Sequence, residues 1–585
     1  MGDLLGYWGR EGAANTAQLL ARLGQEPNDL LDDPLAIAGL HSAQQVPRLT
    51  PTGRPAKHDG LVLRFPPQLV DPGFQPGGQF SPSVCFAGPA GVACWATVVE
   101  LDADGGTITL EWKAASQELG VIPTQVVLSE WVDPGVKRGA LEELGTAVEN
   151  GTATDNVQMA LLAAAPPRFV GPGPTGGEFS DDIDDAMRWV LELDRTCIPI
   201  QGPPGTGKTW TGAHLVLALV RAGKRVGVTA MSHHAIDNFL REVIDVFTAE
   251  GSTAALSIAR VGARDSTPSH AALQCVDNAA AANRDFNLVA GTTWAFASSG
   301  LRDSPVDVLI IDEAGQLGLA DALAASSAAG SVVLLGDPLQ LPQVAQASHP
   351  RRSGVSVLEH MLGPDVATVP PSRGVFLATT RRMHPDVCRF ISDEIYEGRL
   401  VAHESCALQG TEFGTGVRWL QATHAECSTE SREEAELVAG QVHALLGRPW
   451  TDAKGVSRPL TSDDFMVVAP YNDQVRLMRA MFDADPALAG VKVGTVDKFQ
   501  GQQAPVVFFT MTTSTSDDMP RGPGFLFSRN RLNVALSRAK CLAYVVCTED
   551  LLNSRARTVD EMRLISTLCA AVDYSDRVEE GRAKG

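Results

Sequence analysis

Metal-binding signatures are missing from this sequence of 585 residues. Its ten cysteines are scattered, with no pair in the C-x-x-C spacing and no matching pair of histidines. Zinc sites and iron–sulfur clusters need such closely spaced ligands, so neither is expected and the thiols should be reduced. The sequence also lacks a signal peptide and an apolar run of membrane length, which predicts a cytoplasmic protein that does not enter membranes.

The sequence has fewer basic than acidic residues. The 48 lysines and arginines face 69 aspartates and glutamates, which gives a formal net charge of −21. Proteins that bind nucleic-acid backbones usually carry a basic surface, so the total charge counts against such a partner. The basic residues are locally concentrated, however, at Arg351-Arg352, at Arg381-Arg382 and over 529–540. A basic groove on an otherwise acidic surface therefore stays compatible with the composition.

The order of local patterns predicts an α/β protein with several parts, because this length exceeds one hydrophobic core. The pattern over residues 1–55 predicts a helical segment. The pattern over residues 56–165 predicts a small β-rich, barrel-like domain with a hairpin over 95–112. An Ala/Gly/Pro-rich linker follows over 163–177. Over 178–370 and again over 375–572, apolar runs alternate with helical patterns, which predicts two parallel-sheet lobes in tandem.

A phosphate-binding pattern, G-x-x-x-x-G-K-[ST], separates an apolar run at 197–200 from a helical pattern. Its glycines let the backbone fold tightly, so that N–H groups can point at a β-phosphate. Lys208 would reach the β- and γ-phosphates, and the Thr209 hydroxyl would bind Mg²⁺. The strand–loop–helix context predicts a nucleotide site formed by Gly202, Pro203, Pro204, Gly205, Thr206, Gly207, Lys208 and Thr209.

Two further apolar runs end in polar residues. Asp312 follows the run 308–311 and can bind Mg²⁺, while Glu313 beside it can polarise an attacking water. This pair predicts hydrolysis of the nucleotide, against the alternative of a plain acidic turn. The run 332–335 leads into a loop where Gln340 would sense the γ-phosphate; an ordinary loop is the alternative there. One lobe with the phosphate loop and another with arginines predict a shared cleft that closes on the nucleotide.

Taken together, the motifs over 178–550 resemble superfamily 1 helicases, specifically the 5′→3′ branch of Upf1-like and Dna2-like enzymes. In the second lobe, Thr380-Arg381-Arg382-Met383-His384-Pro385 is similar to the family's Y-R-M-H-P, and 531–540 is similar to its last motif. The resemblance implies two RecA-like lobes, with Arg382 on the γ-phosphate and Arg538 as the arginine finger. The implied catalytic residues are Lys208, Thr209, Asp312, Glu313, Gln340, Arg382 and Arg538, with Thr209 and Asp312 as metal ligands.

The resemblance also implies contacts to a nucleic-acid backbone across the tops of both lobes. Small hydroxyls can bond phosphate oxygens beside any base, and their alternative role is to cap the following helices. The implied contacts fall in four motifs and are Thr229, Ser232, Thr292, Thr293, Pro470, Tyr471, Thr495 and Asp497. The last two belong to the segment 494–503, which resembles the motif that couples nucleic acid to ATP.

Three positions depart from the family pattern. The family places a glutamine upstream of the phosphate loop to read adenine, but 180–187 carries aspartates and isoleucine here, which puts strict adenine selectivity in question. Arg381 replaces a tyrosine and can still stack on a base. Gln503 replaces a glutamate near the ribose. Arg381 and Gln503 complete the implied nucleotide-binding set, and none of the three changes touches hydrolysis.

The N-terminal stretches 4–11 and 63–68 are similar to bacterial proteins in which a RecB-like nuclease precedes such a helicase. No nuclease constellation is visible, so this chain would be the helicase half of such a system or a fragment of it, with the nuclease in cis or in trans.

The sequence thus predicts a monomeric, ATP- and Mg²⁺-dependent helicase or translocase that moves 5′→3′ on single-stranded DNA or RNA. DNA is favoured by the resemblance only. Two alternatives stay open: an ATP-gated clamp or remodeller that does not unwind, and a P-loop NTPase that acts on protein partners.

Overall fold

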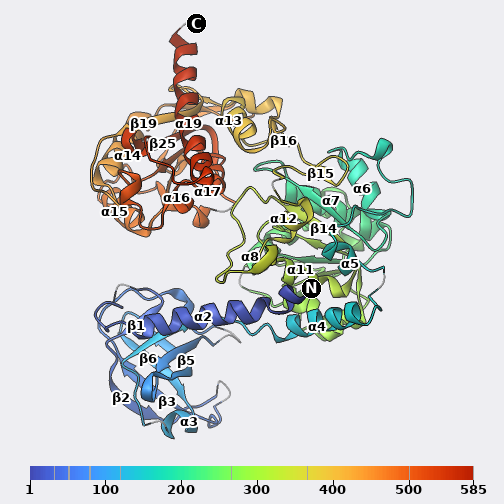
Figure 1. Ribbon diagram of the computed structural model, residues 1–585, viewed down its shortest axis with the longest axis vertical. Helices are drawn as coiled ribbons and strands as arrows, with labels where there is room; N and C mark the ends of the chain where they lie inside the picture. Colours follow the sequence, from blue (N-terminus) through green and yellow to red (C-terminus); the bar gives the residue numbers. More distant parts are fainter. Residues whose placement is uncertain are drawn as a thin grey trace. The chain divides into compact units, whose positions relative to one another are not determined.

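The computed structural model describes residues 1–583 apart from 32, 51–52, 78–80, 119, 154, 265, 365 and 500. Its contacts divide the chain into two compact units (Figure 1). The smaller contains Gly2–Gly135 and Ala345–Arg351; the larger contains Val136–Val344 and Arg352–Gly585, with Met1. Among the described helices, none is both long and apolar enough to cross a membrane.

The smaller unit combines helices α1 (Gly2–Leu5) and α2 (Tyr7–Leu23) with a seven-stranded antiparallel sheet. The sheet has the order β1-β7-β4-β5-β6-β3-β2 and buries one apolar core. Its strands are β1 (Ala36–Ala38), β2 (His41–Val46), β3 (Asp59–Arg64), β4 (Ser83–Ala87), β5 (Ala93–Asp102), β6 (Thr107–Trp112) and β7 (Gln125–Ser129). Helix α3 (Ala114–Glu118) lies between β6 and β7 in the chain.

One expectation for this unit is met, and two others are changed by the structure. The predicted hairpin over 95–112 is present as β5 and β6. The predicted helical segment 1–55, however, stops at Leu23, because Gly24 ends the helix and a Pro-containing stretch follows. Strands β1 and β2 from that segment join the sheet. They form its two edges among the described residues, so the ladder is open, not closed as a barrel.

The first lobe of the larger unit is an eight-stranded parallel sheet with the order β11-β10-β12-β9-β13-β14-β8-β15. Its strands are β8 (Cys197–Gln201), β9 (Val226–Thr229), β10 (Ile258–Val261), β11 (Leu273–Val276), β12 (Leu288–Ala290), β13 (Val306–Ile311), β14 (Ala329–Gly336) and β15 (Val375–Phe376). Its helices are α4 (Gly135–Glu149), α5 (Val157–Leu162), α6 (Ile183–Leu191), α7 (Lys208–Arg221), α8 (His233–Ala249), α9 (Thr293–Ala297), α10 (Ser299–Asp303), α11 (Leu319–Ala325) and α12 (Val357–Leu362).

The second lobe is a five-stranded parallel sheet with the order β19-β25-β24-β22-β23. Its strands are β19 (Gly416–Ala422), β22 (Phe465–Ala469), β23 (Lys492–Thr495), β24 (Ala504–Thr510) and β25 (Ala539–Thr548). Its helices are α13 (Pro385–Ile395), α14 (Arg432–Leu445), α15 (Asn472–Asp483), α16 (Pro523–Leu526), α17 (Arg529–Leu536), α18 (Glu549–Leu552) and α19 (Val559–Ala583). Short strands lie beside it: β16 (Thr379–Thr380), β17 (Val401–Ala402), β18 (Gly410–Thr411), β20 (Pro449–Thr451) and β21 (Ser457–Pro459).

Two parallel sheets, each with its own apolar core, confirm the prediction of two RecA-like lobes. Parallel strands buried on both faces read as continuous apolar runs, which is why these runs were visible in the sequence. The boundary at 375 differs. Strand β15 pairs with β8 and completes the first sheet, so the second lobe begins after Phe376.

Candidate nucleotide-hydrolysis site

The phosphate loop joins β8 to α7 at the carboxyl edge of the first sheet. Gly205 and Gly207 take left-handed backbone conformations, with φ of 78° and 83°. A Cβ atom on Gly205 would come within 2.5 Å of the Arg382 Cβ, so the loop backbone packs tightly against the second lobe. The Nζ of Lys208 donates to the carbonyl of Gly202 at 2.7 Å. Loop, lysine and the N-terminus of a 14-residue helix together form an anion-binding arrangement.

The predicted acidic pair lies at the end of β13. Burial and the charge of Glu313 raise the pKa of Asp312 to about 7, and Lys208 opposes this. Glu313 has a φ of 52°, a conformation that costs a non-glycine residue about 1–3 kcal/mol. Backbone bonds from the Asp312 N–H to Thr229 and from the Ala314 N–H to Leu335 hold the turn. Two carboxylates crowded this closely fit a divalent cation, which would favour their ionised forms.

Two arginines of the second lobe complete the site. Arg538 is 3% exposed, and burial lowers its pKa to about 10. Burial, and then the charge of Arg538, lower the pKa of Arg382 to about 9. Arg382 donates to the carbonyl of Ser537 at 3.2 Å, but the buried Nε atoms of both arginines have no partner among the described residues. Two desolvated guanidinium groups that repel each other fit a triphosphate.

One cavity of about 400 Å³ brings these groups together. The predicted residues that line it are Pro203, Pro204, Gly205, Gly207, Lys208, Thr209, Glu313, Gln340, Arg381, Arg382, Gln503 and Arg538. Gly202 and Thr206 belong to the loop without lining this cavity, and Asp312 is buried beside it. Trp210, Glu242 and Gly501 also line the cavity and were missed. Trp210 directly follows the motif, whereas Glu242 on α8 carries no sequence signal.

A buried hydrogen-bond network links the loop of Gln340 to the second lobe. Asp337 accepts from the Gln340 amide at 2.9 Å and from the Tyr396 hydroxyl at 2.6 Å. Asn533 on α17 donates to that hydroxyl and to the carbonyl of Leu339, both at 2.8 Å. No local pattern pointed to Tyr396 or Asn533 in this role, because the contacts join residues far apart in the chain.

The predicted nucleic-acid residues differ in exposure. The exposed ones are Ser232 and Asp497, and the partly buried ones are Thr292 and Thr495. Ser232 accepts from the Ala235 N–H at 3.1 Å, so it also caps α8. Four of the predicted residues are buried, so their side chains are not accessible to a nucleic-acid strand in this conformation: Thr229, Thr293, Pro470 and Tyr471. Gln500, in the segment 494–503, lies outside the described residues.

Two family models, each described as an AAA domain, match residues 179–354 and 354–550. The Arabidopsis thaliana "DNA replication ATP-dependent helicase/nuclease JHS1" is 26% identical, over 67% of this chain and 31% of its own length. The Rattus norvegicus "DNA-binding protein SMUBP-2" is 27% identical, over 64% and 43%. The Saccharomyces cerevisiae "DNA replication ATP-dependent helicase/nuclease DNA2" is 23% identical, over 66% and 27%.

The matched part therefore spans less than half the length of each of these relatives. The match runs through both lobes, which carry the ordered motifs and the cavity where they meet. Both lobes are thus similar to superfamily 1 helicases, in the branch of Upf1-like and Dna2-like proteins.

Proposed function

We propose that this protein is an ATP- and Mg²⁺-dependent helicase or translocase that moves along single-stranded nucleic acid. One observation carries the proposal: Arg382 and Arg538 of the second lobe line the same cavity as Lys208 and Glu313 of the first. A site divided between two lobes makes nucleotide binding and lobe closure the same event.

Each residue has a distinct role in this proposal. The phosphate loop and Lys208 hold the β- and γ-phosphates, and Thr209 and Asp312 hold Mg²⁺, which neutralises charge on the phosphates when bound. Glu313 accepts a proton from the attacking water. Arg382 and Arg538 donate to the γ-phosphate, where their unmatched positive charge stabilises the transferring group.

The coupling to movement runs through the network at Asp337. A γ-phosphate that engages Gln340 shifts its bond to Asp337, and Asp337 also holds Tyr396 of the second lobe. Ser232, Thr292 and Thr495 are the proposed phosphate contacts, since these residues are exposed or only partly buried.

Relatives named for DNA replication and DNA binding support DNA as the track. The 5′→3′ direction follows from the resemblance of the motifs alone, and action as a monomer in the cytoplasm is part of the proposal. The relatives named helicase/nuclease support a nuclease partner in cis or in trans.

ATP hydrolysis with and without single-stranded DNA and RNA tests the proposal, beside Lys208→Ala and Glu313→Gln as controls. Stimulation by one polymer, lost in both variants, supports a nucleic-acid motor and identifies its track. Hydrolysis indifferent to both polymers contradicts it and favours an NTPase that acts on protein. Strand displacement on duplexes with 5′ or 3′ overhangs then separates a helicase from a clamp that hydrolyses without unwinding.

A further inference from the structure

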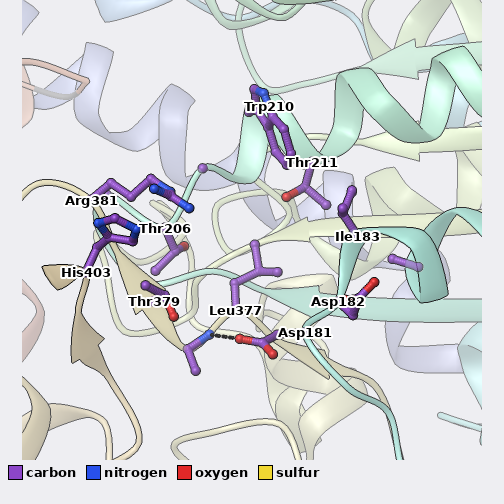
Figure 2. A pocket seen from close by; sticks show the side chains of 14 residues that line it. Asp181, Asp182, Ile183, Thr206, Trp210, Thr211, Leu377, Thr379, Arg381 and His403 are labelled. Carbon is purple, nitrogen blue, oxygen red and sulfur yellow. Dashed lines mark hydrogen bonds between the residues drawn. The ribbon is translucent and has the colours of Figure 1, made fainter. Parts of the chain in front are cut away.

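A second cavity, of about 790 Å³, adjoins the proposed phosphate site (Figure 2). The two cavities share Gly205, Gly207, Trp210 and Arg381. The second also has apolar lining from Ile183, Ala186, Leu377 and Ala378. A triphosphate on the phosphate loop would therefore place its nucleoside here. A preference for one base in this cavity rests on the proposed function and would specify the nucleotide that the protein hydrolyses.

One side of this cavity offers hydrogen-bond acceptors. The Oδ2 of Asp181 accepts from the Ala378 N–H at 3.3 Å, which fixes the carboxylate and leaves Oδ1 without a bond to any described residue. The Oδ1 of Asp182 accepts from the N–H groups of Asp184 and Asp185 at the start of α6, so its Oδ2 is the oxygen that could accept from a base. An ionised carboxylate can only accept, so this side is complementary to N–H groups of a base.

The other side offers donors. The Nδ1 of His403 accepts from the Ser405 N–H at 3.2 Å, so the proton of the neutral ring is on Nε2. Arg381 has five donors and no acceptor. Figure 2 shows Arg381 and His403 together at one side of the cavity, apart from Asp181 and Asp182. Among the described residues that line the cavity, none has an amide side chain. Three threonines, Thr206, Thr211 and Thr379, also line it with hydroxyls that can donate or accept, and the Thr206 hydroxyl donates to the carbonyl of Pro203 at 2.8 Å.

Purines differ in how they match such a divided cavity. Guanine has acceptors at O6 and N7 on one edge and N–H donors at N1 and N2 on the next, whereas adenine alternates its N6 amino group with acceptors at N1 and N7. A carboxylate that spans adenine N6 and the neighbouring N1 or N7 meets one donor and one lone pair, whereas one that spans guanine N1 and N2 meets two donors. We propose that this cavity selects guanine, so that the protein hydrolyses GTP at least as efficiently as ATP, with Asp181 as the residue that sets the preference.

Steady-state hydrolysis of GTP, ATP and ITP, each with single-stranded DNA, tests the preference. We expect kcat/KM for GTP to equal or exceed that for ATP, and to exceed that for ITP, which lacks the N2 amino group. Asp181→Asn keeps an acceptor for the Ala378 N–H but adds a donor, so it should shift the GTP-to-ATP ratio toward ATP by about tenfold. Asp184→Asn removes the same charge from α6 outside the cavity and should leave the ratio unchanged.

A preference for ATP of tenfold or more that Asp181→Asn does not alter would overturn the inference while leaving the motor intact. If no nucleotide is hydrolysed, the proposed function fails instead. Displacement of a fluorescent guanine nucleotide by unlabelled ATP and GTP then still measures the base preference, and tighter binding of ATP would again contradict it.

Discussion

Replacing Arg538 by methionine should change stability and catalysis in opposite directions. Burial lowers the pKa of Arg538 to about 10 and that of Arg382 to about 9. One pKa unit corresponds to about 1.4 kcal/mol, so each guanidinium costs the unliganded protein on the order of a few kcal/mol. A buried charge replaced by an apolar side chain of similar size is often stabilising by about 1–4 kcal/mol. Without nucleotide, we expect Arg538→Met to raise the free energy of unfolding by about 1–3 kcal/mol.

The same substitution should lower kcat for ATP by about 10³-fold or more, the range typical of an arginine finger. Thermal unfolding with and without a non-hydrolysable ATP analogue connects the two effects. The analogue should raise the melting temperature of the wild-type protein more than that of Arg538→Met, because the phosphates offset the repulsion between Arg382 and Arg538. Arg432→Met, which replaces an exposed arginine on α14, is the control and should leave kcat unchanged. An unliganded Arg538→Met protein that is less stable than wild type, with kcat within tenfold, would refute this reasoning.

Three other expectations are simpler to test. Glu313→Gln should bind ATP normally and hydrolyse it about 10²–10⁴-fold more slowly in single-turnover assays; equal rates would remove its role as base. Tyr396→Phe leaves Asp337 without one buried donor, so it should cost about 1–3 kcal/mol in chemical denaturation and weaken stimulation by single strands, with KM for ATP unchanged. Burial, with the charge of Arg260, lowers the pKa of His233 to about 4. Its contribution to stability is therefore full above about pH 6.5 and is lost as the pH falls toward 4; melting temperatures of His233→Asn should fall less over that window.

The positions of the phosphate loop and Asp312 at strand ends could be predicted from the sequence, because each follows a short apolar run that forms a buried strand. The buried arginines are predicted only through a resemblance, since the sequence alone does not show whether a charged side chain will be buried. The link from Tyr396 to Asp337 and Asn533 joins residues 59 and 137 positions apart, and no periodicity encodes such pairings. Strand β15 has two residues, too few for an alternating pattern.

A further element invisible in the sequence is the segment Ala345–Arg351, which packs within the smaller unit although its neighbours on both sides belong to the larger. Glu11 on α2 accepts from the N–H groups of Gln346 and Ala347 at 3.1 and 3.0 Å, and from the His349 ring at 2.6 Å. These three bonds join two stretches of the smaller unit that are more than 330 positions apart in the chain, since Gln346 lies 335 residues after Glu11.

The loop of Gln340 is held from both lobes of the larger unit: by Asp337 at the tip of the first sheet and by Asn533 of the second lobe. The same Asp337 carboxylate also accepts from Tyr396, so a shift of Asp337 would alter its hydrogen bonds to both Gln340 and Tyr396. In the proposed function, the repulsion between the buried Arg382 and Arg538 would supply energy for that movement, because phosphate binding would offset it and phosphate release would restore it. The site that would hydrolyse the nucleotide is thus connected, through hydrogen bonds, to the elements that would have to move.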